Sequence, residues 1–171
     1  MCLKRNAPIS NALSFDIEEW YQTIFFYDQC KNQIKETSLK ENVFEILSLL
    51  SQYRTKATFF IVASTAEKYP ELVVRIALDG HEIASHGYLH KSIFTLSRRQ
   101  FKEDVAKSIK VLQEITKVKV LGYRAPTWSI TKSTPWAIEV LQSLGLKYDS
   151  SIYHLGLRFS SCKKCFYSIR D

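Results

Sequence analysis

The sequence contains no run of eighteen apolar residues, and this absence argues against a transmembrane helix. Its first eight residues lack the apolar core of a secretory signal peptide, so a cytoplasmic location is the expectation. Internal repeats and low-complexity stretches are also missing. These absences leave a single globular unit as the simplest interpretation of the chain.

Cysteine is scarce, with four residues in a chain of 171. This number is too small to form a disulfide framework for a domain of this size. Cys162 and Cys165 form an isolated C-x-x-C, and Cys2 and Cys30 are not the second pair that a structural zinc site needs. The cysteines therefore indicate neither a disulfide-stabilised fold nor a cysteine-bound metal.

The composition is that of one ordinary globular domain with a core, since 46% of the residues are apolar and 24% are charged. Lysine and arginine number 24 against 17 acidic residues, which gives a formal net charge of +7. The excess is spread along the chain, with a denser cluster after residue 155. A solvated surface is favoured over an anionic or membrane partner, and nucleic-acid binding has only the net charge in its favour.

Short β-rich runs alternate with amphipathic segments, which predicts an α/β fold with a largely parallel sheet. Capping boxes are expected at Ser38 with Glu41 and at Ser97 with Gln100. We divide the chain into an arm (1–10), a domain (11–154) and an atypical tail without period (155–171). The expected strands are 11–17, 57–63, 81–85, 118–123 and 146–148, and the expected helices are 39–53, 70–78, 98–116 and one from Thr134-Pro135 to Gly145.

The polar residues of interest come directly after predicted strands. In a parallel α/β barrel or sheet the carboxyl ends of the strands lie on one face, where active sites are built. Residues far apart in the sequence are therefore expected to converge at that face. In chain order they are Asp16, Glu18, His86, His90, Arg124 and Asp149.

A divalent metal is indicated by the His86-x-x-x-His90 pair together with the upstream acids. Two imidazoles and one carboxylate fill three positions of a zinc-type ion and leave one for a water, which the metal activates for hydrolysis. Asp16, Glu18 and Glu19 cannot all be ligands, because clustered carboxylates repel unless a cation or a guanidinium compensates them. We assign Glu18 to the metal and Glu19 to a solvated loop, with the reverse assignment left open.

Two further residues, Arg124 and Trp128, belong to this interpretation, and one other histidine, His81, is excluded from it. Arg124 is followed two residues later by a proline, and a guanidinium in a stiff turn suits an ion pair with Asp16. Trp128 offers a flat face to a sugar ring, with core packing as the alternative. His81, at the start of the third strand, is expected to lie on the opposite face and to be structural.

Three segments contain these residues, and together they resemble the polysaccharide deacetylase family, the NodB-homology domain of carbohydrate esterases. They are the acidic motif 14–20, the histidine motif 85–90 and the Arg-x-Pro motif 124–128, with 57–60 similar to the family's second strand. The resemblance covers residues 11–153. Where the usual first motif has a second aspartate this chain has Ile17, which resembles a subgroup with an Asp-x-Glu-acid-aromatic signature, some of whose members belong to exopolysaccharide biosynthesis.

The resemblance implies a distorted (β/α) barrel that removes N-acetyl groups from an amino-sugar polysaccharide or oligosaccharide with a divalent metal, zinc being the expected one. Asp16 would be the general base, Arg124 would tune it, and Asp149 in a fourth motif would support the arginine. The implied metal ligands are Glu18, His86 and His90, and the candidate substrate-binding residues are Trp128 and Tyr123.

A fifth family motif, a Leu-x-x-His that supplies the general acid, has no counterpart here, and His154 is too close to the fifth strand to replace it. We therefore expect a chain that is truncated at its C-terminus. Two alternatives stay open. One is an incomplete domain that binds metal and glycan without efficient turnover, and the other is hydrolysis of another C–N bond, as in a cyclic imide or ureide.

Overall fold

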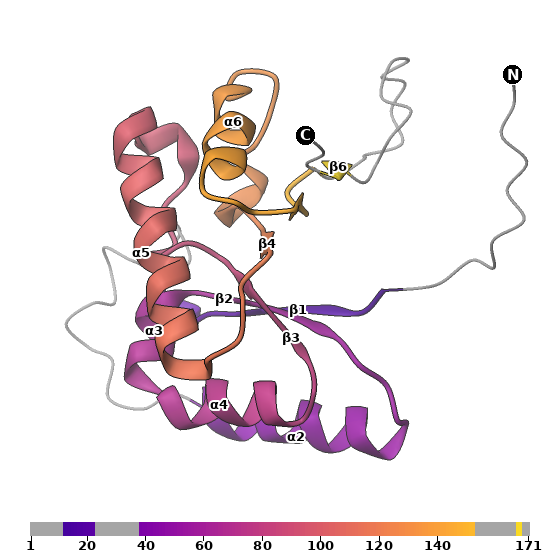
Figure 1. The fold of residues 1–171 in the computed structure, drawn as a ribbon. Helices are drawn as coiled ribbons and strands as arrows, with labels where there is room; N and C mark the ends of the chain where they lie inside the picture. The colour runs from indigo at the N-terminus through magenta and orange to yellow at the C-terminus, as the bar shows by residue number, and fades with distance from the viewer. Residues whose placement is uncertain (1–11, 23–37, 153–166, 169–171) are drawn as a thin grey trace, which may run out of the picture.

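The computed structural model describes residues 12–22, 38–152 and 167–168 (Figure 1). Its sheet has six strands in chain order, of which β1 to β5 are parallel and β6 is antiparallel to β5. The predicted α/β fold with a parallel sheet is confirmed. The strands are β1 (Ser14–Ile17), β2 (Thr58–Ile61), β3 (Glu82–Ser85), β4 (Gly122–Tyr123), β5 (Tyr148–Asp149) and β6 (Tyr167–Ser168).

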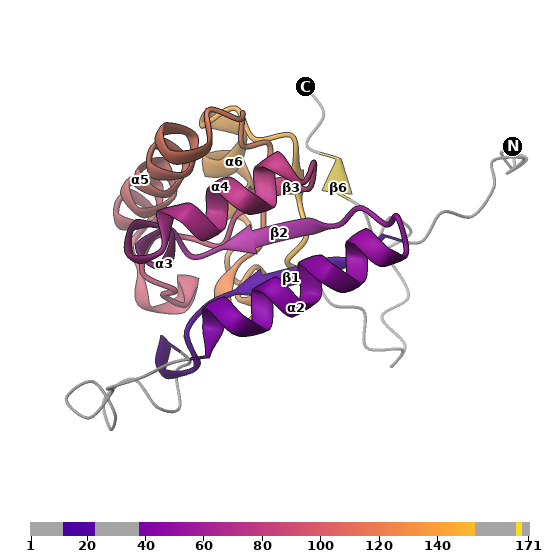
Figure 2. The same ribbon diagram turned by 90° about the horizontal axis from the view of Figure 1, so that it is seen from below.

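In Figure 1 the helices lie below, to the left of and above the strands, in a row that follows the chain, and Figure 2 shows the same row from below. Parallel neighbours in strict chain order need crossovers of the same hand, which place every helix on the same face and curl the sheet as in a β/α barrel. The α-helices are α2 (Leu39–Gln52), α3 (Ala63–Lys68), α4 (Pro70–Leu78), α5 (Arg98–Thr116) and α6 (Trp136–Ser143), and the 3-10 turns are η1 (Trp20–Gln22), η2 (Ile93–Thr95) and η3 (Pro126–Trp128).

Local signals in the sequence set some element ends and miss others. The ends of α4 and α5 are as predicted, and Ser97 forms its capping box with Gln100. The predicted box at Ser38 is wrong, because its side chain accepts no capping hydrogen bond. Helix α3 was not expected as a separate element, and it ends two residues before Pro70, the first residue of α4. Strand β4 has two residues instead of six.

Consecutive residues of each strand face opposite sides of the sheet. Asp16, Phe60 and Ala84 lie in register on the inner side of the curved sheet. The neighbouring register row faces the helices and the apolar core, and it consists of Ile17, Ile61, Ser85, Tyr123 and Asp149. This alternation decides which predicted site residues can reach a common point.

Several expectations fall outside the described residues, namely the arm 1–10, the four cysteines, His154 and all of the tail except the two residues of β6. None of the helices in the described part of the chain combines the length and apolar character needed to span a membrane.

Candidate active site

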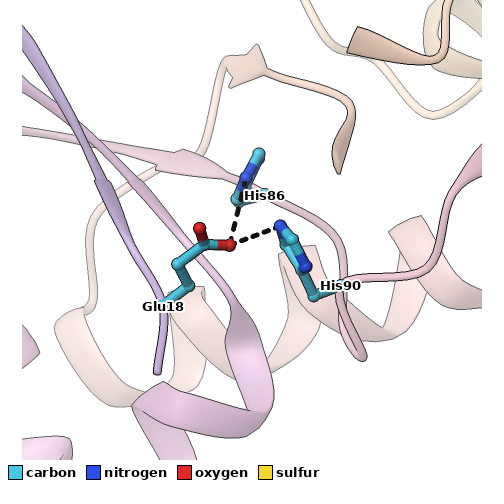
Figure 3. Close-up of side chains that lie close together, drawn as sticks. All are labelled: Glu18, His86 and His90. Atoms are coloured by element: carbon cyan, nitrogen blue, oxygen red, sulfur yellow. Dashed lines mark ion pairs between the residues drawn. The ribbon is translucent and has the colours of Figure 1, made fainter. Parts of the chain in front are cut away.

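Glu18, His86 and His90 meet at the carboxyl ends of β1 and β3 (Figure 3). Oε2 of Glu18 pairs with Nε2 of His90 and lies 3.9 Å from Nε2 of His86. The ligand atoms of the three residues are all within 4.8 Å of one another. Bonds of about 2 Å to a zinc-type ion place its ligands roughly 3–4 Å apart, so this arrangement is close to what one shared ion requires.

The donors also fit a metal in their orientation. Nδ1 of His86 is 2.7 Å from the carbonyl oxygen of Arg124, and Nδ1 of His90 is 2.9 Å from the carbonyl oxygen of Gln22. A proton on each Nδ1 leaves Nε2 unprotonated and turned toward Glu18. Oε2 of Glu18 is shielded from water and faces the Nε2 atoms of both histidines, and a cation shared by the three groups would satisfy this buried oxygen.

Burial and mutual charge set the ionisation of the three groups. Burial lowers the pKa of His86, which favours the neutral, metal-binding form of its imidazole. Burial also acts against the charged form of His90, but the adjacent Glu18 carboxylate outweighs it and raises the pKa of His90. Burial alone would raise the pKa of Glu18. The two histidines outweigh burial and lower this pKa, so the Glu18 carboxylate is held ionised.

Asp16 lies beside this cluster and pairs with Arg124, as predicted. Its Oδ1 accepts from Nη1 of Arg124 at 2.6 Å, and its Oδ2 is 3.9 Å from Nε2 of His86. One carboxylate oxygen is thus fixed by the guanidinium while the other faces the histidines. The arrangement places a potential proton acceptor next to the candidate metal centre.

All three guanidinium nitrogens of Arg124 donate hydrogen bonds, and the side chain is only 12% exposed. Nη2 donates to Oγ of Ser14 and to Oγ of Ser150, and Nε donates to the carbonyl oxygen of Ser150. Its Cζ lies 4.0 Å from the ring centroid of Phe60 on the inner side of the sheet. A guanidinium packed in this way has one orientation, so it fixes the Asp16 carboxylate in space.

Ser14, Ser150 and Phe60 are partners of Arg124 that the sequence motifs do not indicate. A signal was present for Ser14, because it lies two residues before Asp16 in a strand and therefore faces the same side. Phe60 is in register with Asp16, but this pairing depends on the alignment of two strands more than forty residues apart.

Asp149 lies on the helix-facing side and not among the site residues. Its carboxylate accepts from the backbone N–H and the hydroxyl of Ser151, and Oγ of Ser151 in turn accepts from the N–H of Ala125. No ion pair between Asp149 and Arg124 is found among the described residues. Asp149 therefore acts on the arginine loop through Ser151, and burial raises its pKa to about 6.

Tyr123 lies in the same helix-facing row and is 1% exposed, with its ring packed edge-on against Phe101 of α5. Burial at this level leaves no ring atom for a glycan to touch. The expected substrate contact by Tyr123 is corrected accordingly, because consecutive strand residues face opposite sides and Arg124 takes the side of the site.

Trp128 is 44% exposed, and its ring centroid is 5.3 Å from Cζ of Arg124. Trp128 is therefore an exposed side chain outside the hydrophobic core, and it lies next to the Asp16–Arg124 pair. His81 is buried, and its Nδ1 accepts from the N–H of Ala57, away from the metal-facing residues, as expected for a structural histidine.

Glu19 is the clearest departure from the sequence prediction. We expected it in a solvated loop, but it is 2% exposed and pairs with Nζ of Lys68 at 3.0 Å. Burial of a carboxylate requires such a partner. The candidate metal group contains Glu18 and not Glu19, in line with our assignment of the metal carboxylate.

Comparison with known proteins shows the family to which the chain belongs. The sequence model of the polysaccharide deacetylase family matches residues 14–148. This range contains Asp16, Glu18, His86, His90 and Arg124. The chain belongs to the polysaccharide deacetylase family. It is 31% identical over 109 residues to a peptidoglycan deacetylase of Helicobacter pylori and 32% identical over 96 residues to a peptidoglycan-N-acetylglucosamine deacetylase of Bacillus cereus.

The structural similarity extends further along the chain than these alignments. The crystal structure of a Mycobacterium smegmatis protein assigned to the polysaccharide deacetylases matches with a TM-score of 0.71 and a sequence identity of 30%. The match covers 85% of the present chain and 55% of the Mycobacterium smegmatis chain. The alignments with the two curated deacetylases cover 64% and 56% of the present chain and 36% and 35% of theirs. The chain thus spans about a third of the length of the two curated relatives.

Proposed function

We propose that this polysaccharide deacetylase removes N-acetyl groups from an amino-sugar polymer or oligomer in a metal-dependent reaction. The observation that carries the proposal is the convergence of Glu18, His86 and His90 next to the Asp16–Arg124 pair. Each part has a chemical task in amide hydrolysis, and residues from three separate strand ends supply them.

The three ligands would hold a divalent ion, with zinc favoured by the two imidazoles and one carboxylate. The bound ion would supply Lewis acidity toward a water and the acetyl carbonyl. Asp16 takes the proton of the water, since its Oδ2 faces the histidines while Oδ1 is bound to Arg124. Arg124 keeps this carboxylate in one orientation, and Asp149 holds the loop after β4 through Ser151.

An exposed aromatic side chain supports a carbohydrate as the substrate. Trp128 presents its ring beside Arg124, where it can cover the apolar face of a pyranose adjacent to the acetylated residue. The curated relatives are named for peptidoglycan deacetylation, and an N-acetylated amino sugar is the corresponding substrate class for this chain.

The test compares metal-stripped and zinc-reloaded protein by the release of acetate from N-acetylglucosamine oligomers. We expect release only from the reloaded protein. D16N should keep a zinc stoichiometry near one and lose about a hundredfold or more of the rate, because proton transfer to a positioned base contributes about that factor. E18Q and H90A should lose both zinc and activity. Equal rates from stripped and reloaded protein would refute the proposal.

A second candidate is a domain that binds metal and glycan without efficient turnover. It is favoured by one observation, that no histidine other than His86 and His90 lies at the site among the described residues, so a proton donor for the amine is not evident there. Zinc bound at a stoichiometry near one, together with no acetate release from any N-acetylated glycan, would support this candidate over hydrolysis.

A further inference from the structure

The buried carboxylate of Glu19 is anchored to the end of α3. Its Oε1 accepts from Nζ of Lys68 at 3.0 Å and from the hydroxyl of Tyr69 at 2.9 Å. A carboxylate that is 2% exposed depends on these donors, because an unpaired charge is very unfavourable away from water. The pair therefore ties the segment after β1 to a helix more than forty residues away in the sequence.

A second anchor lies three residues further on, at Gln22. Its Oε1 accepts from the backbone N–H of Glu19 at 2.8 Å and from the hydroxyl of Thr65 at 3.0 Å. Its Nε2 donates to Oγ of Ser64 at 3.2 Å, and its own N–H donates to the carbonyl oxygen of Glu19. The turn from Glu19 to Gln22 is thus closed on itself and attached to the first turn of α3.

This turn carries two groups that the candidate metal centre uses. Glu18 directly precedes it, and the carbonyl oxygen of Gln22 lies 2.9 Å from Nδ1 of His90. His86 is oriented independently, by the carbonyl oxygen of Arg124 after β4. A shift of the turn would consequently move Glu18 and His90 relative to His86.

We propose that Glu19, through its ion pair with Lys68, is a positioning residue for the metal centre. It holds the turn 19–22 on α3 so that Glu18 and His90 face the same ion as His86. This role rests on the metal centre of the proposed function, but it does not require that the chain be an active deacetylase. It also gives a task to α3, whose first and last turns are both used as attachment points.

The test is a zinc titration of the full chain in competition with a chromophoric chelator. K68M removes the cation and keeps the length of the side chain, and it should weaken zinc binding about 10–100-fold, the range typical for partners that orient metal ligands. The matched control is K40M. Lys40 pairs with Glu71 at 2.6 Å across the exposed surface between α2 and α4, so K40M should leave zinc affinity within about twofold.

Two more measurements separate positioning from general destabilisation. K68R keeps a cation within reach of Glu19 and should recover most of the lost zinc affinity. The visible absorption of the cobalt(II)-loaded protein reports ligand geometry, and it should change in K68M and not in K40M. E19Q, which keeps an acceptor oxygen but removes the charge, should weaken zinc binding in the same direction and provides a variant if K68M fails to fold.

Wild-type zinc affinity and unchanged cobalt spectra in K68M and E19Q would overturn the proposal. Loss of the folded state in both variants would also overturn it, because the pair would then serve the fold as a whole. A wild-type chain that binds neither ion would refute this role and the proposed function together. A wild-type chain that binds zinc and releases no acetate would refute only the hydrolysis, and the titration would still decide the role of Glu19.

Discussion

Backbone carbonyl groups orient both histidines of the candidate metal centre. The carbonyl oxygens of Arg124 and Gln22 lie 2.7 and 2.9 Å from the Nδ1 atoms of His86 and His90. A carbonyl is present whatever the side chain at its position, so the orientation of each ring depends on where the loop runs. Side chains that hold the loops, such as Ser151 and Glu19, therefore matter to residues that they do not touch.

Asp149 allows a prediction about pH. Burial raises its pKa to about 6, above the ordinary value of 3.8, despite the hydrogen bonds from Ser151. The folded state thus prefers the protonated form, and the stability from this group is complete below about pH 4 and is lost as the pH rises through 6. The whole shift corresponds to about 3 kcal/mol at most, since one pKa unit equals about 1.4 kcal/mol.

The measurement is urea unfolding of wild type and D149N between pH 4 and pH 8 with a chelator present. An asparagine can still accept from Ser151 through Oδ1 but does not ionise. The free energy of unfolding of wild type should fall relative to that of D149N across this range, by up to about 3 kcal/mol. Parallel pH profiles for the two proteins would contradict the prediction.

Among the elements, helix α5 supports the loop that carries both histidines. The carboxylate of Asp104 accepts from the N–H of Tyr88 at 2.8 Å, within the segment between His86 and His90. Gly87 in this loop has a φ of +79°, and a Cβ there would lie 3.0 Å from Oδ2 of Asp104. The glycine between the histidines is therefore needed both for the backbone conformation and for the approach of the helix.

Strand β4 depends on Gly122 because the ring of Tyr148 on β5 covers it. A Cβ at residue 122 would lie 2.1 Å from Cζ of that ring, which is far inside contact distance. G122A should therefore destabilise the fold by roughly 1–3 kcal/mol, the usual result of overfilling a packed site. Thermal and urea unfolding of the purified variant measure this loss.

Two comparisons identify the cause of that loss. In a Y148A background the ring is absent, so G122A should then have little effect on the free energy of unfolding. G145A is the matched glycine control, because a Cβ at residue 145 meets no atom within 4 Å and only its φ of +81° is unfavourable. An equal effect of G122A with and without the Tyr148 ring would contradict the overlap argument.

For the molecule as a whole, the site joins strand ends that are far apart in the chain. Glu18 follows β1 and the two histidines follow β3, and these three groups meet (Figure 3). Arg124 follows β4 and pairs with Asp16 of β1, so the whole site comes together only when the parallel sheet has formed. A metal that binds this arrangement binds the folded state and not the unfolded chain. Metal binding and folding are therefore thermodynamically linked.

The linkage predicts a rise in melting temperature on addition of zinc. At a free zinc concentration of 100 times the dissociation constant the folded state gains about 2.7 kcal/mol. For a domain of this size that corresponds to an increase of about 5–10 °C. Differential scanning calorimetry with zinc and with EDTA measures the shift. H90A should show the same melting temperature in both conditions, and a zinc-induced rise of wild-type size in H90A would contradict the assignment of the ligand.

Much of this arrangement was predictable because it depends on short-range patterns and on the geometry of parallel sheets. The capping box at Ser97 and the proline at 70 defined two helices, and the position of polar residues after strands predicted that Glu18, His86 and His90 would meet. The pairing of Asp16 with Arg124 followed from charge and from the same rule.

The burial of Glu19, the position of Tyr123 and the indirect action of Asp149 were not predictable in this way. Each depends on which side of a strand or turn a side chain faces and on partners such as Lys68 and Ser151 that are distant or have no distinctive motif. Sequence pattern alone thus specified the fold class and the chemical identity of the candidate metal ligands, because both are encoded in residue type and spacing. The side of the sheet and the partner of each remaining charge were set by three-dimensional packing, since burial and register arise only when the strands are assembled.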